Sequence, residues 1–360
     1  MEELERARHA IDEIDAQMAA LFEQRMAQVA RVAAYKQEHD IPVLDAAREE
    51  QVIEKNTARI QDAALRPYYA EFQKAAMAVS RQYQAHALGR DTVAYQGVEG
   101  AFAHIALTRL FPQAKAMACP TWADVFDRVE QGSAAYGVLP FENSHAGDVS
   151  AVLDLCYAHR LHIVEMYDLP VTQNLLALPG AALGDLRRVT SHPQALSQCE
   201  RFIRSVGLAA EPCANTALAA RRVAESGDKT LAAIASAETA ELYGLQVLMR
   251  DINTDGDNTT RFIVVGKELP ARGNRFSLLF TVDHKAGALA RVIQAIAAAG
   301  FNMECIKSRP MPHVPFEYYF YVELVGAADA PDARQLLTGL ETVCRTVRVL
   351  GIYTRKGETV

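Results

Sequence analysis

The pattern of apolar and polar positions changes twice along this chain of 360 residues. Residues 2–39 contain neither Gly nor Pro and carry apolar side chains at heptad spacing, which predicts one long helix. Such a helix would be on the order of 50 Å long. A compact unit of this size has a radius of gyration of roughly 12–13 Å. We therefore expect the helix to pack against a partner chain.

Two shorter helices follow the long one. Ile41-Pro42 ends the first helix. Asp45 can cap a second helix over about 46–60, and Pro67 can occupy the first turn of a third helix that runs to about 87. The first part of the chain is therefore predicted to be all-α.

Beyond Gly89 short apolar runs of strand length alternate with helical stretches, which predicts an α/β domain. The predicted strands are 92–97, 134–140, 160–167, 188–192, 231–236 and 261–266. After a break at Pro270 to Asn274 the elements follow the βαββαβ order of a ferredoxin-like domain. They are strand 275–282, helix 287–299, strand 303–310, strand 315–325, helix 331–341 and strand 345–352. The chain is thus multidomain, with boundaries placed at 1–89, 90–269 and 274–355.

Composition narrows the possible partners. The net charge of −7 argues against nucleic acid, although a local basic pocket could still bind an anion. The six cysteines contain no CxxC pair, which favours reduced thiols in a cytosol over disulfides or a zinc site. No apolar run resembles a signal peptide or approaches the roughly 20 residues that span a bilayer. We expect a cytoplasmic protein with no metal, no cofactor and no membrane partner.

Polar side chains interrupt the apolar stripes of all three predicted helices. On the first helix, Arg25 takes the heptad position of Leu4 and Ile11, and Lys36 returns to within about 20° of that face. A buried Arg is costly unless an anion or carboxylate meets it. The stripe therefore indicates a site for a small dianion. The alternative is a coiled-coil dimer arm whose charges are solvated.

These positions resemble the all-helical chorismate mutases over about residues 1–88. The match comprises Arg8, Ile11, Ile14, Asp15, Arg25, Lys36, Pro42, Val43, Asp45, Arg48, Glu49, Ser80 and Gln84, with a one-residue shift in the loop before the third helix. The resemblance implies an intertwined homodimer, or a higher homo-oligomer, in which Arg8 enters the neighbour's site. It also implies a pericyclic rearrangement of chorismate to prephenate. That reaction needs a selected conformer and stabilised charge on the breaking ether oxygen.

The same resemblance implies a role for each polar residue. Arg8 and Arg25 would clamp carboxylates, and Ser80 would contact a carboxylate. Lys36 and Gln84 would be the catalytic donors to the ether oxygen. The ring hydroxyl region would be held by Asp45, Arg48 and Glu49.

Three polar clusters lie at strand ends or turns of the α/β domain, where such folds build sites. They are Pro140 to Ser144, Ser191 to Gln194 with Gln198, and Asn258 to Phe262. Each alone could be a cap, a turn or an edge strand. Together with residues 94–106 they resemble prephenate dehydratase over about 91–268. The resemblance implies two lobes like those of a periplasmic-type binding protein, with the substrate in the cleft. Lobe one would be about 91–169 plus 255–268, with lobe two between.

The implied reaction expels carbon dioxide and hydroxide from prephenate to give phenylpyruvate, and the hydroxide needs a proton donor or a strong hydrogen bond. The resemblance assigns that role to Thr260, as donor or relay, with Glu142 as a possible ultimate acid. Further candidate substrate contacts are Asn143, Ser144, Ser191, Gln198, Arg261 and Phe262, although Arg261 could instead be structural. His145 stands where the family usually has a small residue, and it is either a surface turn residue or a participant.

Residues 275–352 resemble an ACT regulatory domain through Gly287-Ala288-Leu289, Gly300-Phe301-Asn302 and Ser308-Arg309-Pro310. A helix that starts at Gly leaves free backbone N–H groups suited to an amino-acid carboxylate. The resemblance implies allosteric phenylalanine binding at a subunit interface, with the effector contacts Gly287, Ala288, Leu289, Asn302, Ser308 and Arg309. Lys307 replaces the family's Glu. The alternative is a purely structural ferredoxin-like domain.

The leading hypothesis is a bifunctional enzyme that converts chorismate to prephenate and then to phenylpyruvate, under phenylalanine control. One alternative keeps only the dehydratase and treats the helices as a dimerisation arm, against which the complete polar matches on the helices weigh. The other is a non-catalytic sensor, against which Thr260 in its motif weighs.

Overall fold

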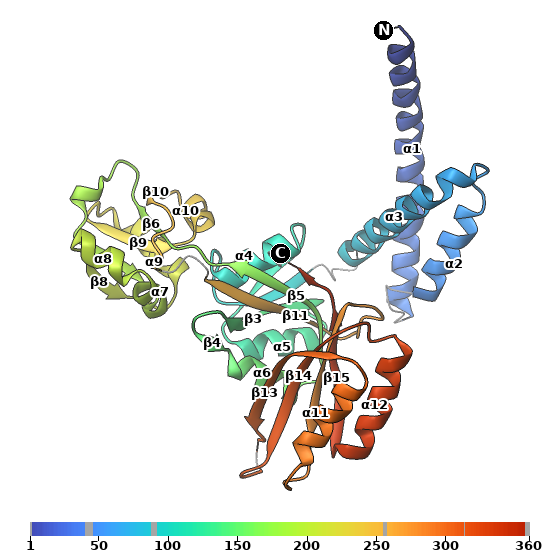
Figure 1. The fold of residues 1–360 in the computed structure, drawn as a ribbon. Helices are drawn as coiled ribbons and strands as arrows, with labels where there is room; N and C mark the ends of the chain where they lie inside the picture. The colour runs from blue at the N-terminus through green and yellow to red at the C-terminus, as the bar shows by residue number, and fades with distance from the viewer. Residues whose placement is uncertain (1, 40–45, 88–91, 255–257, 313, 357–360) are drawn as a thin grey trace. The chain divides into compact units, whose positions relative to one another are not determined.

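The computed structural model describes residues 2–39, 46–87, 92–254, 258–312 and 314–356. The chain divides into two compact units, Met1–Asp91 and Thr92–Val360, and Figure 1 shows the elements of both. Among the described residues no helix is long and apolar enough to cross a membrane.

The first unit is all-α, as the heptad pattern predicts. It consists of α1 (Glu2–Glu38), α2 (Ala46–Thr57), the 3-10 turn η1 (Ala63–Leu65) and α3 (Arg66–Ala87). With 37 residues α1 is about 55 Å long. Its N-terminal apolar stripe is exposed, with Ile11 and Ile14 each 55% exposed and Leu21 62%. Helices α2 and α3 therefore leave much of the stripe of α1 without cover.

The second unit contains two sheets, which confirms the predicted two-lobed α/β arrangement. In lobe one the strands are β1 (Thr92–Gln96), β2 (Lys115–Cys119), β3 (Tyr136–Asn143), β4 (Gly147–Asp148), β5 (His162–Pro170) and β11 (Thr259–Gly266). Its helices are α4 (Phe102–Leu110), α5 (Trp122–Glu130) and α6 (Ser150–Ala158). The strand β11 returns from lobe two to lie antiparallel between β3 and β5.

Lobe two is built on a separate five-stranded sheet in the order β10-β6-β9-β7-β8. Its strands are β6 (Asn174–Ala177), β7 (Arg188–Ser191), β8 (Ala209–Pro212), β9 (Leu231–Ala235) and β10 (Gln246–Met249). Its helices are η2 (Leu183–Asp185), α7 (Pro193–Gln198), α8 (Glu200–Val206), α9 (Thr216–Ser226) and α10 (Ala237–Tyr243). The sequence did not predict strands β2, β4, β6, β8 and β10. The strands β2, β8 and β10 lie at sheet edges, and most of their residues are exposed or only half-buried, while β4 and β6 are only two and four residues long.

The C-terminal module (residues 275–356) has the predicted βαββαβ order. It comprises β12 (Arg275–Thr281), α11 (Ala288–Ala298), β13 (Asn302–Pro310), β14 (Tyr318–Val325), α12 (Pro331–Val343), β15 (Thr346–Tyr353) and a short β16 (Arg355–Lys356). The strand order β13-β14-β12-β15 is that of a ferredoxin-like sheet. Strand β14 begins three residues later than predicted, because Phe316, with a φ of 64°, belongs to the turn before it.

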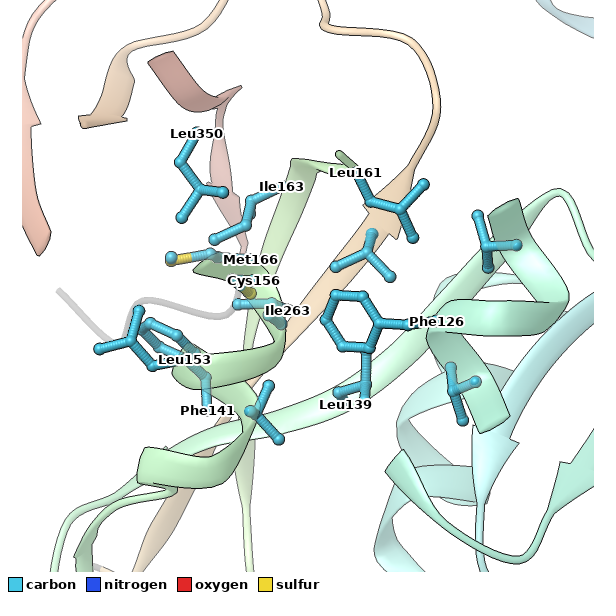
Figure 2. Packing of buried hydrophobic residues seen from close by; sticks show 14 of the residues in the cluster. Phe126, Leu139, Phe141, Leu153, Cys156, Leu161, Ile163, Met166, Ile263 and Leu350 are labelled. Atoms are coloured by element: carbon cyan, nitrogen blue, oxygen red, sulfur yellow. The ribbon is translucent and has the colours of Figure 1, made fainter. Parts of the chain in front are cut away.

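The C-terminal module is not a separate globule. Its sheet continues that of lobe one, since β15 pairs with β5 and β16 also pairs with β5. One face of its sheet packs on α11 and α12. Residues of the other face join the core of lobe one, where Leu350 lies with Ile163, Met166 and Cys156 (Figure 2). The module and lobe one therefore share one hydrophobic core.

A glycine permits the junction between the two parts of this sheet. Gly351 is the partner of Ile163 in the single pair that joins β15 to β5. A Cβ on Gly351 would lie 2.4 Å from the Ile163 carbonyl oxygen and 2.7 Å from the Ile163 Cβ. Only a residue without a side chain lets the two strands approach this closely.

We expect Gly351→Ala to lower the free energy of unfolding by about 1–3 kcal/mol, because the added methyl group has no space at the junction. Gly339→Ala is the matched control. Gly339 lies in α12 with nothing within 4 Å of an added Cβ, so this change should be neutral or stabilise by up to about 1 kcal/mol. Denaturant unfolding of both variants measures the difference. Equal effects of the two substitutions would contradict the proposed role of the junction.

Candidate functional sites

In the helical unit, α1 and α3 bring together the predicted polar residues Arg25, Ser80 and Gln84. Arg25 Nη1 donates to Ser80 Oγ and to the Ala76 carbonyl oxygen, the latter at 3.4 Å. Ser80 and Gln84 are both buried, one turn apart on α3. Within the described part of the chain, Gln84 Oε1 is a buried atom without a hydrogen-bond partner. A half-buried cation beside a buried amide that lacks a partner is the arrangement expected of a polar ligand site.

The other candidate ligand contacts of the helical unit do not cluster with Arg25, Ser80 and Gln84. Lys36 is half-buried near the end of α1, and Arg48 is exposed on α2. Glu49 accepts a hydrogen bond from Arg81 of α3, a partner that the sequence did not point to. Arg8 is exposed and lies about 25 Å along α1 from Arg25, so one chain does not bring these two arginines together.

Asp45, the cap predicted for the second helix and a candidate ligand contact, lies outside the described residues, as do Pro42 and Val43.

In the second unit, the pairing of β11 with β3 creates a polar line on one face of the sheet. Thr260 lies opposite Asn143 in the register of these strands. Asn143 Nδ2 donates to Thr260 Oγ1 at 3.0 Å and to Asn258 Oδ1 at 2.8 Å. Asn258 Nδ2 donates in turn to Gln198 Oε1 of lobe two at 3.2 Å. Hydrogen bonds therefore connect Gln198, Asn258, Asn143 and Thr260 across the two lobes.

A pocket of about 630 Å³ lies where the two lobes meet. Lobe one contributes Ser144 and His145, and lobe two contributes Gln198 and the residues after it. The full lining is Ser144, His145, Ser197, Gln198, Glu200, Arg201, Arg204 and Thr254. His145 thus lies both in a turn and in the pocket wall. The sequence pointed to three of these side chains through the PFENS stretch with His145 and the SHPQ stretch with Gln198.

Six residues of this site were not among the predicted contacts, namely Asn258 and the pocket residues Ser197, Glu200, Arg201, Arg204 and Thr254. Asn258 belongs to the same NTTRF stretch as Thr260, which was the signal that could have identified it. Arg201 and Arg204 follow Gln198 on α8, and Arg204 pairs with Glu200 at 2.6 Å. Among the described residues Arg201 has neither an ion pair nor a hydrogen bond. In the sequence, two arginines on a short helix look the same whether they line a pocket or face solvent, so nothing identified them as site residues.

Two predicted substrate contacts lie in the core instead of the pocket. Ser191 is fully buried, and its hydroxyl donates to the Ile234 carbonyl oxygen at 2.6 Å. Phe262 is 1% exposed and packs with Val138 and Leu169. The structure thus places both among the strands that support the pocket, because alternate residues of a buried strand face the core.

Glu142 and Arg261 lie on the opposite face of the sheet from Thr260, because successive side chains of a strand alternate. Arg261 Nε donates to Asp168 Oδ1 at 3.0 Å, and Arg261 Nη1 donates to Glu142 Oε2 at 3.4 Å. The idea that Glu142 passes a proton to Thr260 therefore fails on this geometry. The alternative that Arg261 is a structural residue, and not a substrate contact, agrees with its ion pairs behind the sheet.

The charges behind the sheet form a network around Asp168. Burial would raise the pKa of Asp168, but hydrogen bonds and charges from Arg261 and Arg355 outweigh burial and hold this pKa below its usual value. Burial would likewise lower the pKa of Arg261, but the hydrogen bond and charge of Asp168 outweigh it and raise this pKa. Both groups therefore remain charged at neutral pH.

In the C-terminal module the predicted effector contacts fall into two groups. Gly287 caps α11 with a φ of 78°, and Ala288 and Leu289 form the first turn of this helix. Strands β12 and β13 are both antiparallel to β14, so Ser308 and Arg309 lie at the same edge of the sheet as this turn. Asn302 lies at the other end of β13, about 20 Å away.

Arg309 already has a partner within the chain. Its guanidinium donates to both carboxylate oxygens of Asp154 on α6, at 3.0 and 2.6 Å, and the Tyr319 hydroxyl donates to Asp154 Oδ1 at 2.6 Å. These bonds and charges from Arg309, against an opposing effect of burial, hold the pKa of Asp154 below its usual value. In this structure Arg309 therefore ties the C-terminal module to lobe one.

Outside these sites, three side chains of the kinds that bind metal ions lie close together. Potential ligand atoms of Asp127, Glu130 and His159 lie within 4.8 Å of one another. Glu130 already pairs with His159 Nδ1 at 3.1 Å and accepts from the Arg160 backbone N–H at 3.1 Å. Asp127 and Glu130 are exposed. We assign no metal to this group.

Comparison with known proteins places these sites in two families. The model of prephenate dehydratase matches residues 93–270, and the model of chorismate mutase type II matches residues 7–85. A bifunctional chorismate mutase/prephenate dehydratase of Neisseria gonorrhoeae is 33% identical over 96% of this chain and 95% of its own length. Arogenate dehydratase/prephenate dehydratase 2 of Arabidopsis thaliana is 37% identical over 73% of each chain.

A solved structure extends the similarity to the fold. The prephenate dehydratase of Arthrobacter aurescens, determined in complex with L-Phe, is 30% identical. It superposes with a TM-score of 0.68 and covers 75% of this chain and 92% of its own.

We expect Asp168→Asn to lower the free energy of unfolding by about 3 kcal/mol near pH 6, because Arg261 and Arg355 would lose their shared buried carboxylate. The pKa of Asp168 in the folded protein is below its unfolded value, so its stabilisation is present above the unfolded pKa of about 4. This stabilisation is lost as the pH falls through the folded pKa. The difference between variant and wild type should therefore shrink as the pH is lowered below about 4.

Denaturant unfolding across this pH range measures the effect. Asp329→Asn removes an exposed aspartate of the same unit and serves as the control. A difference for Asp168→Asn that does not depend on pH would show that the ion pairs are not its source.

Proposed function

This chain belongs to the family of bifunctional chorismate mutase/prephenate dehydratases, and we propose that it catalyses two consecutive reactions. The helical module rearranges chorismate to prephenate. The two-lobed module converts prephenate to phenylpyruvate. The observation that carries the proposal is that both sets of sequence-derived polar residues converge, Arg25 with Ser80 in one unit and Asn143 with Thr260 in the other.

In the mutase step the protein needs no nucleophile, because the rearrangement is pericyclic. Arg25 and Ser80 would bind a carboxylate of chorismate by charge-assisted hydrogen bonds. Lys36 and the Gln84 amide would donate to the ether oxygen as its bond breaks. Asp45, Arg48 and Glu49 would hold the ring hydroxyl region. The support for this assignment is the buried Gln84 amide beside the Arg25 cation.

We place Arg8 in the site of a second copy of the chain. The distance of about 25 Å along α1 separates it from Arg25 of its own chain. The exposed apolar stripe of α1 is the surface that an intertwined dimer would bury. The assembly would therefore be a homodimer or a higher homo-oligomer built on this dimer.

In the dehydratase step the substrate would occupy the pocket between the lobes. Prephenate carries two carboxylates, and Arg201, which has no ion pair among the described residues, is a cation of the pocket available to one of them. Loss of carbon dioxide sends an electron pair into the ring, which becomes aromatic as the C4 hydroxyl leaves. Asn143 Nδ2 donates to Thr260 Oγ1, so the Thr260 hydrogen is available to the departing oxygen. A proton taken up from solvent completes the water that leaves.

The C-terminal module would be an ACT regulatory domain that binds phenylalanine. The free N–H groups at the start of α11 suit the effector's carboxylate. Because Asn302 lies about 20 Å along β13 from Ser308 within one chain, the complete site would combine residues of two subunits. We keep the boundaries 1–89, 90–269 and 274–355 and a cytoplasmic location as parts of this proposal. The six unpaired thiols support the location.

Separate assays of the two steps test the bifunctional assignment. Arg25→Ala should abolish chorismate consumption and leave conversion of prephenate to phenylpyruvate intact, because the two sites lie in different units. Thr260→Val should have the opposite effect, with a loss of at least about 100-fold in dehydratase kcat.

Arg31→Ala, which removes an exposed arginine of α1, and Thr260→Ser, which restores the hydroxyl, are the controls. Arogenate should be assayed beside prephenate, because the A. thaliana relative is named for both activities. Wild-type protein inactive on all three compounds would leave the sensor hypothesis instead.

We expect phenylalanine to inhibit the dehydratase step at millimolar or lower concentration. Asn302→Ala should weaken binding of phenylalanine at least about tenfold without changing the uninhibited rate, because Asn302 is remote from the pocket in its own chain. Calorimetry and inhibition curves measure both, with Gln335→Ala, which changes an exposed residue of α12, as control. Phenylalanine that neither binds nor inhibits at millimolar concentration would refute the regulatory role.

A further inference from the structure

Lys307 is a lysine of the C-terminal module whose ammonium group lies against lobe one. Its side chain is only 8% exposed. Nζ donates to Glu142 Oε2 at 3.1 Å and to Asp148 Oδ1, and it lies 4.8 Å from the centre of the Phe141 ring. An ammonium group is buried at a large cost unless charges of opposite sign meet it. The two carboxylates and the ring face supply that compensation.

Both carboxylates belong to one hairpin of lobe one. Glu142 of β3 and Asp148 of β4 are directly opposite each other in the antiparallel register. Like charges that face each other across two strands destabilise the pairing. The hairpin therefore needs a cation between these side chains, and Lys307 is placed there. It comes from β13, more than 150 residues further along the chain.

The turn of this hairpin forms part of the pocket. Asn143 Oδ1 accepts hydrogen bonds from the backbone N–H groups of His145 and Ala146 at 3.1 and 2.9 Å. The Nδ2 of the same amide donates to Thr260 Oγ1 at 3.0 Å. Ser144 and His145 line the pocket. One amide side chain therefore links the geometry of the turn to the orientation of the Thr260 hydroxyl.

We propose that Lys307 is a positioning residue for the dehydratase reaction. Its charge holds Glu142 and Asp148 together, keeps the β3–β4 hairpin closed, and so fixes Asn143 against Thr260. The C-terminal module is then a structural part of the dehydratase site even when no effector is bound. This inference rests on the proposed dehydratase activity of the pocket.

Lys307 retains its charge at the pH of the reaction. Burial would lower the pKa of Lys307, but Asp148, Cys305 and Glu142 outweigh burial and raise this pKa above its usual value. Arg261 also contacts Glu142, at 3.4 Å, but its nearer partner is Asp168 at 3.0 Å. Asp148 has no such second cation among the ion pairs of the described residues, so Lys307 is the cation that pairs with it.

The test is a charge-compensation experiment on full-length protein without phenylalanine. Lys307→Met keeps an unbranched apolar side chain over Phe141 but leaves two carboxylates opposed. We expect dehydratase kcat to fall about tenfold, with a smaller change in KM, because a displaced Asn143 misorients Thr260 after the substrate has bound. Asp148→Asn in the Lys307→Met background removes the repulsion and should restore kcat to within about threefold of wild type.

Two controls separate this role from a general loss of structure. Lys115→Met removes an exposed lysine of the edge strand β2 and should leave the dehydratase rate unchanged. Chorismate consumption by the helical unit of the same protein should be unchanged in every variant. If Lys307→Met does not fold, Lys307→Gln, which also lacks the charge, takes its place with the same two expected results.

The outcomes are distinct. A folded Lys307→Met protein with wild-type dehydratase kcat would overturn the proposal. So would a loss of kcat that Asp148→Asn does not restore, since removal of the Asp148 charge relieves repulsion between the carboxylates but does not repair a packing defect. Wild-type protein without dehydratase activity would instead refute the proposed function.

Discussion

The insertion of β11 between β3 and β5 is the constraint on which the rest of the second unit depends. Asn143 and Asn258 are 115 residues apart in the chain, yet their side chains meet at 2.8 Å because of this pairing. The register places Thr260 opposite Asn143 and Arg261 opposite Glu142. A shift of one residue would exchange the two faces of the strand. Thr260 would then lie among the charged groups and Arg261 in the pocket.

The two faces of β11 have different chemistry. The face that carries Thr260 presents neutral amides and a hydroxyl, Asn143, Asn258 and Thr260, which are linked by hydrogen bonds to Gln198 of the pocket wall. The rear face holds Arg261 in ion pairs with Asp168 and Glu142, and there the C-terminal module adds Arg355 and Lys307. Buried ion pairs contribute little net stability but strongly disfavour arrangements in which one partner is missing. The rear network therefore specifies the register that the pocket requires.

The shared core bears on how the proposed phenylalanine control would reach the proposed dehydratase site. A module that was attached only by a linker could influence the pocket only by moving as a whole. Here Leu350 packs in the core of lobe one, and Arg309 pairs with Asp154 of α6. A ligand that shifts β13 would therefore act on Lys307 and on the β3–β4 hairpin through direct contacts. Such coupling requires no long pathway.

The sequence by itself determined the helices of the first unit, the two-lobed α/β order and the βαββαβ module, and it pointed to Arg25 with Ser80 and to Asn143 with Thr260. These are local features, since heptad spacing, strand-length runs and short motifs lie within a few neighbouring residues. It could not place Arg201 in the pocket, Ser191 and Phe262 in the core, or Glu142 behind the sheet. It also did not reveal that Lys307 completes a hairpin of another module. Those facts depend on strand order and register between residues that lie from 43 to 165 positions apart in the chain, which only tertiary packing decides.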